Sequence, residues 1–264
     1  MFDTTYHRPK TLAEAVSLFS GDARYISGGQ TLLPAMKLRL AAPTALIDIS
    51  RLAELKGISV AGEVLTVGGG MTHAEVTSSL VAAKAIPALA SLAGTIGDPA
   101  VRHMGTLGGS LANNDPAADY PAPALALGAT IHTNKRKIAA ADFFTGLFST
   151  SLEEGEIVTK VDFPIPAKAA YEKFRNPASR YAMAGVFVAV MKDRSVRAGV
   201  TGAGNNGVFR SDSIEQALTK SWSPSALESI KLDESAMLSD IHGTAAYRAN
   251  LVKVMAKRAV AKAG

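Results

Sequence analysis

The first part of the chain alternates short apolar runs with an amphipathic helical pattern. Thr11-Leu12-Ala13-Glu14 has the spacing of a capping box, in which a hydroxyl and a carboxylate satisfy the first helical amides. It predicts a helix that runs to about Ser20, with Gly21-Asp22 as its stop. Two predicted strands, 23–27 and 44–49, flank a short predicted helix over 32–38. Residues 1–55 are therefore expected to form a small β-α-β lobe.

A different pattern begins at Gly57 and predicts a second lobe over residues 56–165. Thr72-His73-Ala74-Glu75 is a second capping box, and it predicts a helix that continues to about Lys84. The other predicted elements are a strand over 64–67, a helix over 86–93, an apolar segment over 120–127, paired strands over 129–133 and 137–139, and a strand over 157–163. Pro164 and Pro166 mark the end of this lobe.

The last third, residues 166–264, is predicted to be a small α+β domain. Three strands are expected over 171–176, 185–192 and 196–201, followed by helices over 211–219, 223–229 and 244–262. The middle strand is apolar enough to be buried on both faces.

Composition fits a globular protein with a sizeable core, because 47% of its 264 residues are hydrophobic and 19% are charged. The net charge is +5, but the basic residues are scattered and the few aromatic residues do not alternate with them. This pattern argues against nucleic-acid binding. The one basic cluster in the middle of the chain, Lys135-Arg136-Lys137, is interpreted as a solvated hairpin turn.

The chain has no cysteine, which excludes disulfides, cysteine-ligated iron–sulfur clusters and thiol nucleophiles. No two of its five histidines have a metal-ligand spacing, so no metal site is predicted. The N-terminus lacks the apolar core of a signal peptide, and no apolar run is long enough to span a bilayer. A cytoplasmic protein that does not span a membrane is expected.

Two glycine-rich stretches are the main candidates for a binding site: Ser27-Gly28-Gly29-Gln30-Thr31, and the segment from Thr95 to Ser110 that contains Gly108-Gly109. Without a Cβ, glycine lets backbone amides approach a ligand closely, and consecutive exposed amides bind an anion such as a pyrophosphate. Two such stretches indicate one long ligand held by both. The structural alternative is a tight strand–helix connection for the first stretch and a packing turn for the second.

A third glycine motif, Gly202-Ala203-Gly204-Asn205-Asn206-Gly207, matches the G-x-G-x-x-G dinucleotide fingerprint. That fingerprint belongs after the first strand of a βαβ unit and opens a helix directly. Here it follows two predicted antiparallel strands late in the chain, and Asn205-Asn206-Gly207 is typical of a turn. It is interpreted as a structural loop.

Segments 27–39 (SGGQTLLPAMKLR) and 95–119 (TIGDPAVRHMGTLGGSLANNDPAAD) resemble the two FAD loops of the flavin-binding medium subunits of molybdenum hydroxylases, such as carbon monoxide dehydrogenase and xanthine dehydrogenase. The likeness continues at 173–182 (KFRNPASRYA) and 239–248 (SDIHGTAAYR), so it spans nearly the whole chain in order. The resemblance implies an α+β fold: a two-lobed FAD-binding domain of the vanillyl-alcohol-oxidase (PCMH) type followed by a small α+β C-terminal domain.

The resemblance also implies a set of cofactor-binding residues and no catalytic acid or base. The expected FAD-binding residues are Ser27, Gly28, Gly29, Gln30, Thr31, Leu32, Thr106, Gly108, Gly109, Ser110, Asn113, Asp119 and Tyr181. In both loops, backbone amides are expected to donate to the pyrophosphate together with the hydroxyls of Ser27, Thr31, Thr106 and Ser110.

Several roles have alternatives. Asp119 matches an aspartate that accepts from the ribityl chain, but it can also be a helix N-cap or a surface carboxylate. Tyr181 is expected to approach the isoalloxazine, unless it is a half-buried strand tyrosine. Asp98 either contacts ligand or caps a turn. Lys173 and Arg180 either favour the anionic reduced flavin or are solvated.

Gln30 is a departure from many relatives, which carry histidine at this position. In distant flavin oxidases of similar fold, a histidine in this loop bonds covalently to the flavin. Gln30 cannot form that bond and no cysteine is available, so FAD is predicted to bind non-covalently.

The function implied is an oxidoreductase subunit that binds FAD. It would accept electrons from iron–sulfur clusters on a small subunit, after a large molybdenum-cofactor subunit has oxidised the substrate, and pass them to a quinone, NAD or another carrier. A dimer of such heterotrimers is expected. The alternatives are a self-sufficient flavoprotein oxidase or reductase of the same fold, and a scaffold that has lost FAD. A neighbouring gene for a cysteine-rich ferredoxin-like chain would favour the first interpretation.

Overall fold

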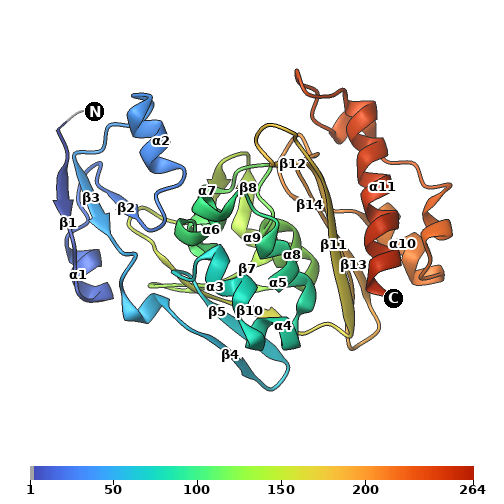
Figure 1. Ribbon diagram of the computed structural model, residues 1–264, viewed down its shortest axis with the longest axis horizontal. Coiled ribbons are helices and arrows are strands. Elements are labelled where there is room, and N and C mark those ends of the chain that lie inside the picture. The colour runs from blue at the N-terminus through green and yellow to red at the C-terminus, as the bar shows by residue number, and fades with distance from the viewer. Residues whose placement is uncertain (1–2) are drawn as a thin grey trace.

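The computed structural model describes residues 3–264, which form three parts that follow one another along the long axis of the molecule (Figure 1). An N-terminal lobe lies at one end, a helix-covered sheet lies in the middle, and a second sheet packed on the long C-terminal helix lies at the other end. Among residues 3–264, no helix combines the length and the apolar character needed to cross a membrane.

The N-terminal lobe is a small parallel sheet with its strands in the order β1-β3-β2. The strands are β1 (Thr5–His7), β2 (Arg24–Ile26) and β3 (Ala45–Asp48), and the helices are α1 (Leu12–Ser17), α2 (Leu32–Lys37) and the 3₁₀ turn η1 (Ala53–Leu55). The sequence prediction missed β1. Its three residues show no apolar alternation, and pairing with β3 holds them in place.

The middle part is an antiparallel sheet in the order β4-β5-β10-β6-β7. Its strands are β4 (Ile58–Ala61), β5 (Val64–Gly68), β6 (Thr130–Thr133), β7 (Lys137–Ala139) and β10 (Val158–Pro164), and a two-stranded hairpin, β8 (Phe144–Gly146) with β9 (Ser149–Thr150), lies beside it. Its helices are α3 (His73–Ser78), α4 (Leu80–Ala85), α5 (Pro87–Gly94), α6 (Pro99–Met104), α7 (Leu107–Asn113), α8 (Pro121–Leu127) and α9 (Ala140–Phe143). One sheet face packs its apolar side chains, such as Val67 and Val161, against helical residues such as Leu89 and Leu111. The sequence prediction missed β4 and the β8–β9 hairpin.

Two predictions for this part need correction. The helix expected over 73–84 is divided at Ser79, whose hydroxyl accepts from the Ala82 amide and so starts a new helix. The second glycine-rich stretch is not a continuous loop, because it contains α6 and α7, which begin after the N-cap residues Asp98 and Thr106. The Thr72–Glu75 capping box is confirmed in full. Thr11 also caps its helix, but the Glu14 carboxylate accepts from the Lys10 amide.

The C-terminal part is an antiparallel sheet in the order β11-β12-β13-β14, with α11 (Ala245–Ala263) packed on one face. The strands are β11 (Lys168–Arg175), β12 (Ala182–Val190), β13 (Val196–Thr201) and β14 (Phe209–Arg210), and the remaining helical segments are α10 (Asp212–Lys220), η2 (Pro224–Leu227) and η3 (Glu234–Ala236). Four strands replace the three predicted, since β14 has only two residues and no readable pattern. A 3₁₀ turn replaces the helix expected over 223–229.

The central strand β12 is buried on both faces, as predicted. Phe187 and Ala189 pack into the core of the middle part, whereas Val186 and Val188 pack against α11. The interpretation of residues 202–207 as a structural loop is also confirmed, because they connect β13 to β14 and open no helix.

Candidate functional site

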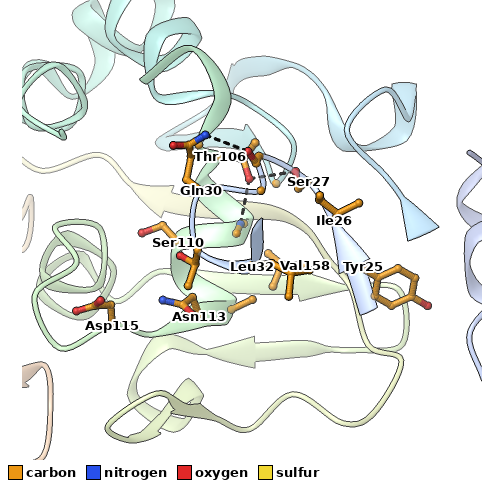
Figure 2. A pocket seen from close by; sticks show the side chains of 18 of the residues that line it. Tyr25, Ile26, Ser27, Gln30, Leu32, Thr106, Ser110, Asn113, Asp115 and Val158 are labelled. Carbon is orange, nitrogen blue, oxygen red and sulfur yellow. Dashed lines mark hydrogen bonds between the residues drawn. The ribbon is translucent and has the colours of Figure 1, made fainter. Parts of the chain in front are cut away.

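A cavity of about 850 Å³ is lined by residues from all three parts of the molecule. Binding sites for small-molecule ligands have volumes of roughly 300–1,000 Å³, so this cavity lies near the upper end of that range. All of the expected FAD-binding residues line it: Ser27, Gly28, Gly29, Gln30, Thr31, Leu32, Thr106, Gly108, Gly109, Ser110, Asn113, Asp119 and Tyr181. Two further lining residues, Tyr25 and Asp115, lie toward opposite ends of the cavity wall drawn in Figure 2.

The first glycine-rich stretch connects β2 to α2 and offers a row of backbone donors. Within residues 3–264, the N–H groups of residues 28 to 32 find no acceptor in the chain. Gly29 has a φ of +68°, a left-handed conformation that glycine adopts without strain. Successive amides in such a turn form a concave site that favours an anion.

The Gly108-Gly109 end of the second stretch differs, because its amides are already paired. The amides of residues 107, 108, 109 and 110 donate to the Met71 carbonyl, the Gly69 carbonyl, the Thr106 hydroxyl and the Thr106 carbonyl, at 3.0, 2.8, 3.1 and 3.0 Å. The prediction that amides of both stretches are available to a pyrophosphate is therefore wrong for residues 107–110 of the second one. What this part of the chain offers the cavity is the side chains of Ser110 and Asn113 on α7 and the exposed face of Gly109.

A hydroxyl bridge joins the two stretches. Thr106 Oγ1 accepts from the Gly109 amide and donates to Ser27 Oγ, 3.1 Å away (Figure 2). The single proton of Thr106 is used in this bond, so the Ser27 hydroxyl proton remains for another acceptor. Thr31 occupies the N-cap position of α2 without a side-chain capping bond.

Close backbone packing explains two of the glycines. A Cβ on Gly28 would lie 2.2 Å from the Met104 carbonyl oxygen, and one on Gly108 would lie 2.8 Å from the Gly69 carbonyl oxygen. A Cβ on Gly109 would meet only the Thr106 hydroxyl, at 2.9 Å. Gly28 and Gly108 therefore let segments approach each other, whereas Gly109 borders open space.

Asp119 is neither a helix N-cap nor a surface carboxylate. Its side chain is 5% exposed, α8 is capped at Tyr120, and its Oδ1 accepts from the Tyr171 hydroxyl. Its Oδ2 accepts from Lys173 Nζ at 2.9 Å. The Lys173 side chain is only 3% exposed, so the alternative that it is solvated is wrong.

Tyr181 lies at the rim of the cavity, just before β12 begins. It is 51% exposed, so it is half-buried as the alternative expects, but it lies just before the strand and not in it. Partial burial and the negative charges of Asp115 and Asp119 raise the pKa of its hydroxyl. Arg180 is exposed beside it, with a φ of +63°.

The structure also explains two other charged motifs. The Asp98 carboxylate accepts from the Val101 amide at 2.9 Å, so it is the N-cap of α6. The predicted hairpin turn at Lys135–Lys137 is confirmed between β6 and β7. Its Arg136 is ion-paired with Glu153 and Glu156.

Some residues of the cavity wall were missed because their sequence pattern carried no signal. Glu153, Glu154 and Glu156 line the cavity on both sides of Gly155, whose carbonyl accepts from the Tyr25 hydroxyl at 3.3 Å. Burial raises the pKa of Glu156, but hydrogen bonds from Arg136, Thr133 and the Glu153 amide outweigh it and hold that pKa at about 2.

His73 is a second missed residue, since the sequence placed it only inside a capping box. It lines the cavity, is 5% exposed, and its Nδ1 has no partner among the described residues. Its ring lies 5.4 Å from that of Tyr120, whose hydroxyl is likewise unpaired within the described chain. Burial, and then the charge of Arg102, lower the pKa of His73 to about 4, so it is neutral at physiological pH.

Comparison with known proteins shows similarity along the full chain. A family described as the FAD binding domain in molybdopterin dehydrogenase matches residues 1–166. The carbon monoxide dehydrogenase medium chain of Afipia carboxidovorans is 36% identical, over 98% of this chain and 96% of that protein. The nicotine 6-hydroxylase medium subunit of Paenarthrobacter nicotinovorans is 35% identical, with the same shares covered.

Solved structures agree with these relatives. A chain of a Cu,Mo-CO dehydrogenase superposes with a TM-score of 0.91 at 33% identity, and the match covers 100% of this chain and 99% of that chain. A chain of quinoline 2-oxidoreductase from Pseudomonas putida 86 superposes with a TM-score of 0.86 at 28% identity, covering 99% and 97% of the two chains.

Proposed function

This chain belongs to the family of FAD-binding medium subunits of molybdenum hydroxylases, and on that premise we propose that it is the electron-transfer subunit of such a complex. FAD supplies the electron-carrying chemistry when it is bound, and the protein supplies position, shielding and charge. The observation that carries the proposal is the row of unpaired amides at residues 28 to 32, which line a cavity large enough for a dinucleotide.

These amides favour the pyrophosphate as their ligand. The Ser27 hydroxyl, with its proton free, adds a donor beside them, and Ser110 and Asn113 add side-chain groups from α7. The pyrophosphate is therefore assigned to the first stretch, and the second stretch forms the wall that faces it.

The two ends of the cavity differ in chemistry, which supports an orientation for FAD. At one end, Phe19 and Tyr25 stack with their rings 5.0 Å apart, and this surface suits the adenine. At the other end lie Asp119 and Tyr181. This second end suits the isoalloxazine, because Tyr181 is exposed there and can shield a flat ring.

The absence of cysteine supports the assignment of the iron–sulfur clusters to another chain. A small cluster-bearing subunit and a large molybdenum-cofactor subunit are the proposed partners, assembled as a dimer of heterotrimers in the cytoplasm. The proposed FAD domain is of the PCMH type. Its boundaries are residues 1–55 and 56–165 for the two lobes, with 166–264 as the C-terminal domain. The short connections from η1 to β4 and from β10 to β11 support these limits.

Titration of the purified full chain with FAD and with FMN tests the proposal. FAD fluorescence should be quenched at saturation, and FMN should bind much more weakly because it lacks the pyrophosphate. The bound flavin should be reducible by dithionite, yet the chain alone should not oxidise an organic substrate. Equal affinity for the two flavins would contradict the pyrophosphate assignment, and substrate turnover by the chain alone would favour the oxidase alternative.

A further inference from the structure

The C-terminal sheet holds one wall of the cavity in place. The turn over residues 115–119 belongs to the middle part and places Asp115, Ala118 and Asp119 in the cavity wall. From β13, the Thr201 hydroxyl lies 2.6 Å from the Ala118 carbonyl, and from the loop after it the Gly202 amide lies 2.8 Å from the Pro116 carbonyl. From β11, Tyr171 and Lys173 bind the two oxygens of Asp119.

Asp119 and Lys173 form a buried ion pair that crosses the boundary between the middle part and the C-terminal part. Their side chains are 5% and 3% exposed, so water screens neither charge appreciably. Tyr171 is also buried, at 4% exposure, and its hydroxyl lies where a Cβ on Gly185 would be only 2.2 Å away. Both oxygens of the Asp119 carboxylate are therefore bonded, one by Tyr171 and one by Lys173. Because the ammonium balances the carboxylate, the net charge of the pair at the cavity is close to zero.

A second ion pair across the same boundary provides a contrast. Lys192 and Glu63 are 2.7 Å apart, but their side chains are 47% and 69% exposed and neither lines the cavity. Pairs of this kind contribute little in water. The Asp119–Lys173 pair differs from the Lys192–Glu63 pair in being buried and in having its carboxylate in the cavity wall.

We propose that Lys173 is a positioning residue for the flavin, which holds the Asp119 carboxylate in the cavity wall and balances its charge. The C-terminal domain thereby sets the charge that the flavin experiences and, with it, the reduction potential of the bound cofactor. This inference rests on the proposed FAD site and concerns only the end of the cavity that contains Asp119.

The test measures the midpoint potential of the flavin in full-length variants loaded with FAD, against a reference dye in mildly alkaline buffer. Lys173→Met leaves the carboxylate unpaired and should shift the potential to more negative values, because reduced flavin carries negative charge. Asp119→Asn leaves the ammonium unpaired and should shift the potential in the opposite direction. The double variant should return toward the wild-type value.

Controls separate this role from a purely structural one. Lys173→Arg keeps the charge and Lys192→Met removes the exposed pair, so both should retain the wild-type potential. If Lys173→Met fails to fold, the midpoint potential of Asp119→Asn is compared with that of Lys173→Arg, and this comparison still gives the direction of the shift. Shifts of the same sign, or none, in the two single variants would overturn the inference while FAD binding stands. Wild-type protein that binds no FAD would instead refute the proposed function, and the inference with it.

Discussion

Gly28 packs against Met104 so closely that a Cβ at position 28 would lie 2.2 Å from the Met104 carbonyl oxygen. Met104 ends α6, and Gly28 belongs to the stretch with the unpaired amides. The contact holds the two glycine-rich stretches against each other where both line the cavity.

Gly28→Ala should separate these stretches. The backbone oxygen has no flexible end that could move away, so we expect a loss of about 1–3 kcal/mol in the free energy of unfolding, as in other overpacked cores. FAD affinity should fall as well. Gly109→Val is the matched comparison, because Gly109 is exposed and meets only the Thr106 hydroxyl. It should fold as apoprotein yet remain colourless, because its side chain occupies the ligand's space. Urea unfolding and FAD titration of both variants check this, and a Gly28→Ala protein with wild-type affinity would contradict it.

Thr106→Ala should weaken both the fold and the site. The N-cap of α7 is lost, at about 1 kcal/mol, and so is the bond that orients Ser27. Thr11→Ala removes a comparable N-cap far from the second stretch and should cost similar stability. Only Thr106→Ala should also reduce FAD affinity, by about five- to tenfold for one weakened hydrogen bond. Equal affinities in the two variants would show that the Thr106–Ser27 bridge has no part in binding.

FAD should leave the protein completely on acid precipitation. Gln30 offers no nucleophile for a covalent bond, and the sequence contains no cysteine. The supernatant should contain all of the yellow colour as FAD, as checked by chromatography against FAD and FMN standards. Flavin that stays on the denatured protein would contradict this expectation.

Helix caps and strands were predictable from sequence where residues close together in the chain determine the local structure. The Thr72–Glu75 capping box satisfies its own amides, and the alternating apolar residues of β12 meet cores on both faces. The short strands β1 and β14 were not predictable, because two or three residues are held by distant partners and carry no periodicity.

The candidate site shows the same division. Every residue predicted from the two stretches lines one cavity. The sequence could not show, however, that Met71 and Gly69 accept from amides of the second stretch. Nor could it pair Asp119 with Lys173, since 54 positions separate them.

As the pH falls, protonation of His73 in the unfolded state should lower the free energy of unfolding before most carboxylates begin to titrate. The folded pKa of about 4 lies below the unfolded value of 6.5, so only the unfolded state gains a proton between these limits. Stability should therefore be unaffected above pH 6.5 and should fall as the pH decreases toward 4, by about 3 kcal/mol in full. His73→Gln should flatten this part of the profile, while His103→Gln, at an exposed site, should not. Urea unfolding across this pH range measures the slope, and an unchanged slope in His73→Gln would rule out this origin.

Asp119→Ala should cost more than the loss of one hydrogen bond. It leaves the Lys173 ammonium buried without its partner, and breaking a buried pair in this way costs about 3–5 kcal/mol. Tyr171→Phe removes a single donor and should cost about 1 kcal/mol. The double variant Asp119→Ala/Lys173→Met removes both charges and should recover much of the lost stability. Urea unfolding of the apoproteins completes this double-mutant cycle without any contribution from FAD. Additive effects of the two single changes would show that the carboxylate and the ammonium stabilise the fold independently rather than as a pair.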